Sequence, residues 1–480
     1  MPLKSINPAT AALIAEYPAD SAAEIEAKLA TAWEAWRSWS QTPLGERSAL
    51  MARLGDLLEQ RADDYARLIT MEMGKPIGEA KAEVLKSASG ARHFAAEGPA
   101  YLADQPIAGT PSRVRYQPLG PIFGIMPWNL PFWQVLRFFI PTALAGNVVL
   151  VKHAETVQGA ARAIAQLVRD AGGPEGLYTN LAIPNETIAD TARQIVLDDR
   201  IRAVTLTGST AAGRAVAAAA GSVGKKVVLE LGGSDAFVVF ADADLDKAVT
   251  LGVVSRFSNN AQSCIAAKRF LVERSVFDSY VARYAAAAGA LVIGDPADPA
   301  TKLGPMARAD LVATTERQVR DAVAAGGRVV AGGRRVSGPG NYYEATVIVG
   351  ADPDAPIMRE EFFGPVALFF PFEGEDEAVR LANATEYGLG GAVWSSDTER
   401  AQRVADRLEA GAVFINDFVR SDPRAPFGGV KGSGFGRELG ALGARELTNA
   451  KLVWGELGRV ATETPAAVSR PLAPLGRGPG

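Results

Sequence analysis

The chain has 480 residues, of which 48 % are hydrophobic and 22 % are charged, and its formal net charge is −4. This length predicts two or more domains, because a single hydrophobic core stops growing at about 250–300 residues. The small negative charge gives no basic surface of the kind that binds nucleic acid, and no apolar run reaches about 18 residues without charge. We therefore expect neither a nucleic-acid partner nor a membrane span.

The start of the chain lacks a basic segment followed by an apolar one, so we expect no secretory signal. The chain contains one cysteine, Cys264, and two histidines, His93 and His153, which are not clustered with other metal ligands. A single cysteine cannot form an intrachain disulfide, and isolated histidines do not indicate a metal centre. We expect a cytoplasmic protein without a metal site.

The hydrophobic pattern predicts an α/β protein. Residues 21–100 carry apolar side chains at helical spacing, residues 112–127 have the pattern of strands, and residues 128–145 are predicted to form a helix. Strand and helix patterns then alternate as far as residue 233, which indicates a parallel sheet covered by helices.

A second α/β pattern begins near residue 231 and continues to residues 411–417. Glycine and proline cluster in a loop at residues 425–436. Residues 456–480 are rich in proline, glycine and alanine, which predicts a surface or disordered tail.

Two stretches could bind a nucleotide. Gly208 allows a tight turn between a predicted strand and helix, and Ser209 can cap that helix, whose N-terminus attracts phosphate. Such a turn is also common in α/β proteins that bind no phosphate. Lys152 and Glu155 follow another predicted strand and could reach ribose hydroxyls, although a surface ion pair is the simpler explanation of this stretch taken alone.

Three further residues could carry chemistry. Glu230 lies in an apolar strand, where burial would raise its pKa toward that of a general base, or where a structural salt bridge would neutralise it. Asn129 follows Trp128 at the predicted start of a helix, as an N-cap or as a donor to an oxyanion. Cys264 has small and amide neighbours, although most free cysteines are merely buried hydrophobic residues.

Together and in this order, the motifs resemble the aldehyde dehydrogenase family over roughly residues 5–455. "PWN" resembles the oxyanion motif and implies that role for Asn129. "LELGG" implies that Glu230 is the general base, and "NNAQSC" implies that Cys264 is the nucleophile. The resemblance implies that the Cys264 thiolate attacks an aldehyde, that a thioester forms, and that Glu230 activates the water that releases the acid.

The resemblance also implies a nicotinamide cofactor, for which we expect NAD, with NADP possible. The charge of Glu155 near the ribose 2′ position would repel a phosphate there. The expected cofactor-binding residues are Trp128, Lys152, Glu155, Gly208, Ser209, Gly213, Leu231, Glu361 and Phe363.

Several stretches look closest to the bacterial succinate-semialdehyde dehydrogenase branch of that family. Arg137 lies in an apolar segment, and on one helix it would face the same side as Trp133 and Asn129. A guanidinium there needs an anion, either the carboxylate of a semialdehyde or a protein carboxylate. Some family members have an arginine where this chain has Ser258. The expected substrate-binding residues are Trp133, Arg137, Arg420, Ser421 and Phe427, and the C-terminal signature also contains Glu438.

The resemblance implies a Rossmann-like NAD-binding domain, an α/β catalytic domain and a small β oligomerisation arm, assembled as a homodimer or homotetramer. The expected bounds of the NAD-binding domain are 1–99 and 119–231. Those of the catalytic domain are 232–440, and those of the oligomerisation arm are 100–118 and 441–455. Three alternatives to a semialdehyde dehydrogenase stay open: a hydrolytic enzyme of broad specificity, a CoA-acylating enzyme and an inactive relative. Glu230 argues against the second, and the presence of Cys264, Glu230 and Asn129 argues against the third.

Overall fold

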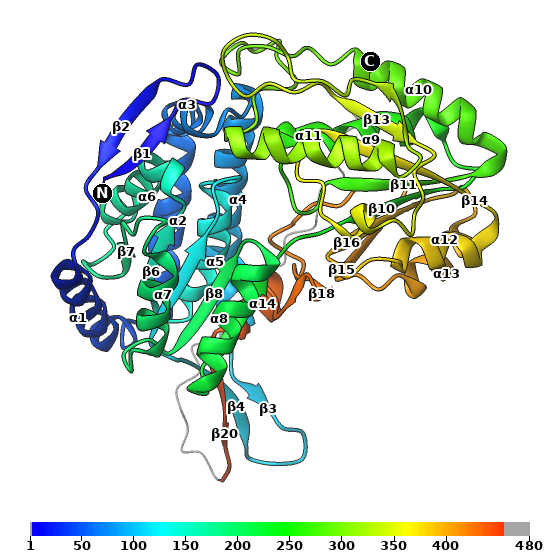
Figure 1. The fold of residues 1–480 in the computed structure, drawn as a ribbon. Helices are drawn as coiled ribbons and strands as arrows, with labels where there is room; N and C mark the ends of the chain where they lie inside the picture. The colour runs from blue at the N-terminus through cyan, green and yellow to red at the C-terminus, as the bar shows by residue number, and fades with distance from the viewer. Residues whose placement is uncertain (1, 456–480) are drawn as a thin grey trace.

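The structure is a computed structural model that describes residues 2–455, so the predicted tail at 456–480 lies outside the described residues. Figure 1 shows two lobes, each built around its own sheet, and three strands that project from the first lobe. The α/β architecture predicted from the sequence is confirmed.

The first lobe contains a six-stranded sheet with the order β19-β9-β8-β5-β6-β7. The five strands from β9 to β7 run parallel to one another, and β19 is antiparallel to β9. The strands are β5 (Pro121–Met126), β6 (Val148–His153), β7 (Tyr178–Asn180), β8 (Ala203–Thr207), β9 (Lys226–Glu230) and β19 (Gly434–Phe435). Because β19 comes from the glycine-rich segment near the C-terminus, this late part of the chain lies against the strand that ends at Glu230.

Helices surround this sheet, and a short hairpin that the sequence analysis did not predict opens the chain. The hairpin is β1 (Leu3–Ile6) and β2 (Leu13–Tyr17). The helices are α1 (Ala22–Trp39), α2 (Leu44–Gln60), α3 (Ala62–Met73), α4 (Ile77–Tyr101), α5 (Trp133–Leu144), α6 (Gln158–Asp170), α7 (Ile188–Leu197) and α8 (Thr210–Ser222). The one-turn helix η1 (Glu155–Val157) precedes α6.

The second lobe contains a seven-stranded sheet with the order β12-β13-β14-β11-β10-β16-β17, in which only the β12–β13 pair is antiparallel. The strands are β10 (Asp235–Val239), β11 (Ala267–Glu273), β12 (Arg328–Ala331), β13 (Thr346–Val349), β14 (Val366–Phe372), β16 (Gly390–Trp394) and β17 (Ala412–Ile415). The helices are α9 (Leu245–Phe257), α10 (Phe277–Gly289), α11 (Ala309–Ala324), α12 (Gly374–Asn383) and α13 (Thr398–Arg407), with the short helices η2 (Ser258–Ala261), η3 (Arg274–Val276) and η4 (Pro356–Arg359).

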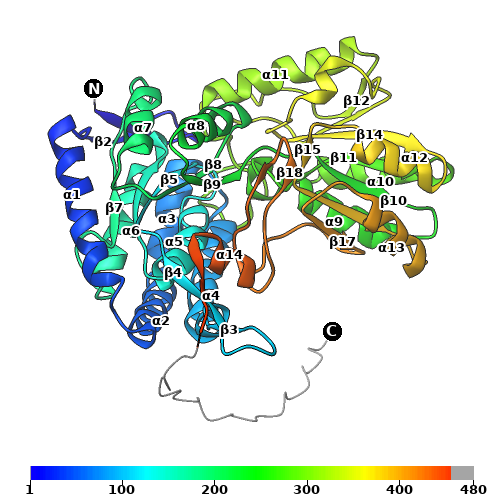
Figure 2. The same cartoon turned by 90° about the horizontal axis from the view of Figure 1, so that it is seen from below.

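The projecting sheet has the order β20-β4-β3 and is seen at the bottom of Figure 1. Its strands are β3 (Gln105–Pro106), β4 (Arg113–Pro118) and β20 (Thr448–Val453), and they come from the two segments that the sequence analysis assigned to an oligomerisation arm. The remaining elements are the β15 (Tyr387–Gly388) and β18 (Val430–Lys431) pair and the helix α14 (Gly440–Glu446). Seen from below in Figure 2, β15 and β18 lie toward the second lobe and α14 toward the first.

One predicted boundary is wrong in a way that affects the site. The helix expected at 128–145 begins only at Trp133, with Phe132 as its N-cap residue. Pro131 disfavours helical backbone at the residue before it, so Asn129 lies in the preceding loop rather than at a helix start. In the described part of the chain, no helix combines the length and the apolar character needed to cross a bilayer.

Candidate active site

Cys264 follows a loop with an unusual backbone. Three consecutive residues, Asn259, Asn260 and Ala261, have φ angles of 58°, 53° and 60°. Asparagine tolerates this left-handed region better than most residues, but at alanine it is a strained conformation that the surroundings must hold in place. The loop therefore has a defined shape immediately before the cysteine.

Amide side chains hold this loop. The side chain of Asn260 donates to the carbonyls of Gly74 at 2.7 Å and Pro305 at 2.9 Å, and it accepts from the N–H of Gly304 at 2.8 Å. Asn260 has no exposed surface. The buried amide of Asn260 therefore braces the loop before the cysteine.

Asn129 is joined to the same loop. Its side-chain amide donates to the carbonyl of Gln262 at 2.9 Å, two residues before Cys264, and only 4 % of the residue is exposed. The Asn259 side chain donates both to this carbonyl and to the carbonyl of Asn129. Because a primary amide has two N–H groups, Asn129 keeps a second donor for another acceptor.

The electrostatic surroundings of Cys264 favour the neutral thiol. Burial raises the pKa of Cys264 to about 12, while the positive charges of Arg137 and Lys268 act in the opposite direction. Glu361 and Glu230 raise this pKa further. Charged groups of both signs therefore act on this partly exposed cysteine.

Glu230, the last residue of β9, is 2 % exposed. Neither of its carboxylate oxygens has a hydrogen-bond partner among the described residues. Burial, and then the charge of Glu438, raise the pKa of Glu230 well above its usual range, and Arg137 opposes both. A Cβ atom on Gly428 would lie 2.8 Å from Glu230 Oε1, so a glycine is needed beside this carboxylate.

The predicted phosphate-binding turn lies against the strand of Glu230. The N–H of Gly208 donates to the Glu230 carbonyl at 3.0 Å, and Ser209 caps α8 by accepting from the N–H of Ala212. A Cβ atom on Gly213 would be 2.5 Å from a side-chain carbon of Leu231, so a larger residue there would require Leu231 to shift. The free N–H groups at the start of α8 suit the pyrophosphate of a dinucleotide.

Lys152 and Glu155 lie together at the carboxyl end of β6. The Lys152 ammonium is 3.4 Å from Asn185 Oδ1, and Glu155 accepts from the N–H of Asn185 at 3.1 Å. Burial lowers the pKa of Lys152, and Glu155 opposes that shift. A buried ammonium with one long hydrogen bond has donors left for ribose oxygens, which fits the predicted cofactor site.

The remaining predicted cofactor residues lie beside the cysteine loop. Glu361 accepts from the N–H of Gly233 at 3.0 Å. Phe363 and Trp128 contact each other edge to face, with ring centroids 5.9 Å apart. A Cβ atom on Gly232 would lie 2.6 Å from Glu361 Oε2, so glycine lets the backbone pass close to this carboxylate.

Arg137 has a protein partner. It forms an ion pair with Glu438, and the two side chains are 2 % and 6 % exposed. Its guanidinium also lies 4.6 Å from the ring centroid of Phe427. Phe427 and Glu438 exchange two backbone hydrogen bonds of 2.7 Å, which hold Glu438 in place. Of the two anions considered from the sequence, the structure therefore provides the protein carboxylate.

Trp133 and Ser421 also meet. The indole N–H of Trp133 donates to Ser421 Oγ at 3.0 Å. The ammonium of Lys86, on α4, donates to the same oxygen at 2.8 Å and lies 4.7 Å from the Trp133 ring centroid. The sequence analysis missed Lys86, because a lysine in an amphipathic helix has no feature that distinguishes it from a surface lysine.

The structure does not bring Arg420 into this group. Its side chain is 49 % exposed and is ion-paired with Asp417 at 2.7 Å, and it packs on Phe414 and Phe418. Ser421 is buried, whereas the Arg420 side chain beside it in the chain is directed toward solvent. The expectation that Arg420 binds substrate is not supported by this position.

Comparison with known proteins identifies the family. The family model described as "Aldehyde dehydrogenase family" matches residues 1–453. The chain belongs to the aldehyde dehydrogenase family. A Synechocystis protein named probable succinate-semialdehyde dehydrogenase, NADP(+), is 47 % identical over 456 residues, which is 95 % of this chain and all of that protein. The Escherichia coli succinate semialdehyde dehydrogenase named for NAD(P)+ is 45 % identical, over 94 % of this chain and 97 % of that protein.

A solved structure shows the same fold. The succinic semialdehyde dehydrogenase of Streptococcus pyogenes, in complex with NADP+, superposes with a TM-score of 0.91 at 34 % identity. The superposition covers 94 % of this chain and 99 % of that one. The fold of this aldehyde dehydrogenase is therefore that of its solved relatives over nearly the whole described chain.

Lys268 is a second residue of this aldehyde dehydrogenase that the sequence analysis missed. Its side chain has no exposed surface, lies 3.3 Å from Glu361, and donates to the carbonyls of Ser263 at 3.0 Å and Cys264 at 2.7 Å. A lysine inside the mostly buried strand β11 was the signal that could have identified it. It links the nucleophile loop to the glutamate on the expected cofactor side.

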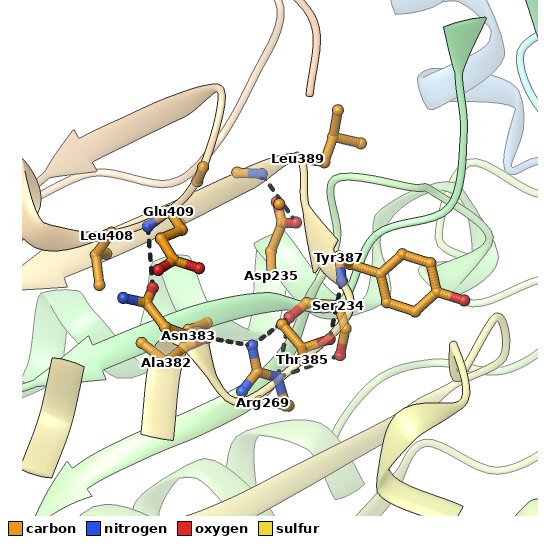
Figure 3. A pocket seen from close by; sticks show the side chains of 15 residues that line it. Ser234, Asp235, Arg269, Ala382, Asn383, Thr385, Tyr387, Leu389, Leu408 and Glu409 are labelled. Atoms are coloured by element: carbon orange, nitrogen blue, oxygen red, sulfur yellow. Dashed lines mark hydrogen bonds between the residues drawn. The ribbon is translucent and has the colours of Figure 1, made fainter. Parts of the chain in front are cut away.

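Figure 3 shows a small cavity in the second lobe. It is lined in part by Asp235, Arg269 and Tyr387. Arg269 donates to the carbonyls of Ser234, Leu381 and Ala382, so its charge is well solvated by the backbone. We assign this cavity to the packing of the second lobe.

Proposed function

We propose that this aldehyde dehydrogenase oxidises succinic semialdehyde to succinate through a thioester on Cys264, with NAD as its cofactor. The main observation that supports this reaction is the hydrogen bond from the Asn129 amide to the carbonyl of Gln262, in the strained loop before Cys264. The buried carboxylate of Glu230 acts electrostatically on the same cysteine. The substrate rests on the names of relatives in several bacteria, which are called succinate-semialdehyde dehydrogenases.

In this reaction the Cys264 thiolate attacks the aldehyde carbon. The free amide N–H of Asn129 and the backbone N–H of Cys264 stabilise the oxyanion that forms. Collapse of the oxyanion leaves an acyl group on the cysteine sulfur, and a bound nicotinamide supplies the acceptor for the hydride. Glu230 removes a proton from water, the water oxygen attacks the thioester, and Cys264 leaves as the thiolate.

The raised pKa of Glu230 suits this role, because a base with an unshifted carboxylate pKa would take a proton from water poorly. Among the described residues, no hydrogen-bond partner fixes the orientation of the Glu230 carboxylate. The carboxylate is therefore available both to a water molecule and to movement away from the cysteine.

The cofactor proposal rests on Glu155. Ser209 at the start of α8 would receive the pyrophosphate, Lys152 and Glu155 the adenosine ribose, and Glu361 the other ribose. The negative charge of Glu155 would accept a hydrogen bond from a 2′ hydroxyl and repel a 2′ phosphate. NAD is proposed on this ground, although most of the similar relatives are named for NADP(+).

Two further proposals concern the whole protein. Strand β20 leaves Leu452 and nearby Trp454 exposed, at 55 % and 69 %, and we infer that a second copy of the chain covers them in a homo-oligomer. We also propose that the first lobe binds the dinucleotide and that the second lobe provides Cys264. We further propose that the protein works in the cytoplasm, because a nucleophilic thiol stays reduced there.

A panel of aldehydes with and without a distal carboxylate, each assayed with NAD and with NADP, tests the proposal. We expect the highest kcat/KM for succinic semialdehyde with NAD, without a requirement for CoA. A clear preference for an uncharged aldehyde would replace the proposal by an enzyme of broad specificity.

A further inference from the structure

We propose that Lys86 is a cation that binds the distal carboxylate of the aldehyde substrate, together with the hydroxyl of Ser421. This inference rests on the proposed function and names the residues that give it its specificity. No sequence motif pointed to Lys86, and its role follows from the contacts that the folded chain makes.

The hydrogen bonds at Ser421 leave donors directed at a ligand. Ser421 Oγ accepts from Lys86 at 2.8 Å and from the indole of Trp133 at 3.0 Å. A serine hydroxyl has two acceptor lone pairs and one O–H donor, so both lone pairs are used and the O–H remains. The Lys86 ammonium has two further N–H groups. These donors come from adjacent atoms, as the two oxygens of a carboxylate require.

The nearest protein carboxylates are already paired with other cations. Glu438 forms its ion pair with Arg137. Glu83 forms a buried ion pair with Lys75, in which both side chains are 2 % exposed or less, and it also accepts backbone N–H groups at the start of α5. Neither carboxylate is free to neutralise Lys86.

The third nearby carboxylate is paired as well. Asp422 forms two hydrogen bonds with the side chain of Arg424, at 2.9 and 2.6 Å. In residues 2–455, no Asp or Glu oxygen lies within 4.0 Å of the Lys86 ammonium. Burial, aided by Arg137, lowers the pKa of Lys86 to about 8, with Glu83 and Asp422 opposing the shift. A bound carboxylate would supply the missing counter-charge.

The position of Lys86 suits a short substrate. Trp133, which Lys86 covers, follows Asn129 by four residues, and four residues span at most about 14 Å. Arg137 follows Trp133 by one turn of α5, and its charge lowers the pKa of both Cys264 and Lys86. A four-carbon semialdehyde could therefore have its aldehyde at Cys264 and Asn129 and its carboxylate at Lys86 and Ser421.

Lys86→Met tests the inference, because methionine keeps most of the length and removes the charge. We expect kcat/KM for succinic semialdehyde to fall about ten- to a hundredfold, mainly through KM, and kcat/KM for butanal to stay within about threefold. Lys86→Arg should recover much of the loss, and inhibition by succinate should weaken in Lys86→Met. Ser421→Ala, which keeps the lysine, should show a smaller loss with the same selectivity.

Lys81→Met is the matched control. Lys81 lies on the same helix, is ion-paired with Asp63 at 2.8 Å and is 46 % exposed, so its removal should change neither substrate. Butanal activity and the melting temperature report on folding in every variant.

Two results separate failure of this inference from failure of the proposed function. If the wild-type enzyme prefers butanal, the proposed function is wrong. Suppose instead that the wild-type enzyme prefers succinic semialdehyde. The inference is overturned if both Lys86→Met and Ser421→Ala keep that preference. It is also overturned if both variants lose activity equally toward the two substrates and have a lower melting temperature, because Lys86 is then a structural residue.

Discussion

Arg137 and Glu438 form an ion pair in the interior of the protein, with 2 % and 6 % of their side chains exposed. The guanidinium that the sequence offered as a substrate anchor is thus already neutralised. Its charge also opposes the shifts that raise the pKa values of Glu230 and Cys264, so its main effect is on the charge balance of the site.

Arg137→Met should destabilise the protein by about 3–5 kcal/mol, because it leaves the Glu438 carboxylate buried without a counter-charge. Oxidation of succinic semialdehyde and of butanal should fall together. The double variant Arg137→Met/Glu438→Gln should recover part of the stability in denaturant unfolding. The control is Arg420→Met, which removes an exposed arginine and should change stability by about 0.5 kcal/mol or less. A loss confined to the acid substrate in Arg137→Met would restore the interpretation made from sequence.

Cys264→Ser should lower aldehyde oxidation by at least about a thousandfold, because a serine hydroxyl at its ordinary pKa is a far weaker nucleophile than a thiolate. Cofactor reduction followed by absorbance measures this directly. Asn129→Ala should cost about 10²–10³-fold in kcat, as expected for loss of one oxyanion donor. Turnover within tenfold of the parent in Cys264→Ser would remove this cysteine from the mechanism.

Glu230→Gln should form the thioester and release it slowly. Stopped-flow measurement should show one equivalent of reduced cofactor per active site, followed by near arrest. In the parent enzyme, burial raises the pKa of Glu230, so the deacylation rate should fall as the pH decreases through a value well above the usual carboxylate range. Full steady-state turnover by Glu230→Gln would show that another group activates the water.

The alkylation rate of Cys264 should depend steeply on pH in the free enzyme. Burial raises its pKa to about 12, so the reactive thiolate fraction should increase about tenfold per pH unit from pH 7 to 10, without the plateau near pH 8.5–9 expected of an exposed cysteine. Lys268→Met should slow alkylation at each pH, because this cation favours the thiolate. A plateau below pH 9 in the parent would contradict the burial effect.

Glu155→Ser should shift cofactor preference toward NADP, because it removes the negative charge expected near the 2′ position. We expect kcat/KM with NADP to rise by about tenfold or more relative to that with NAD. Glu186→Gln, at an exposed position in the same region, is the control and should leave the ratio unchanged. A parent enzyme that already prefers NADP more than tenfold would overturn the proposal for NAD.

The sequence by itself determined the family and the α/β architecture. Alternating strands and helices follow from local hydrophobic periodicity, and motifs such as "LELGG" and "NNAQSC" place characteristic side chains within a few residues of one another. For this reason the candidate roles of Cys264, Glu230 and Asn129 could be predicted before the fold was known, and they remain predictions to be tested by the variants above. The predicted helix begins too early because the apolar residues of 128–145 resemble one continuous helix, although Pro131 disfavours helical backbone at the residue before it.

Only the tertiary structure decided which charged groups are neutralised. Lys86 and Ser421 are 335 residues apart in the chain, and Arg137 meets Glu438 across a similar separation. Sequence showed that a buried arginine needs an anion but could not show which one, because ion pairing depends on distance in space and on burial rather than on neighbours in the chain. For the same physical reason, the sequence could not predict that Ser421 is buried, that Arg420 is exposed, or that Lys86 lacks a carboxylate partner among the described residues.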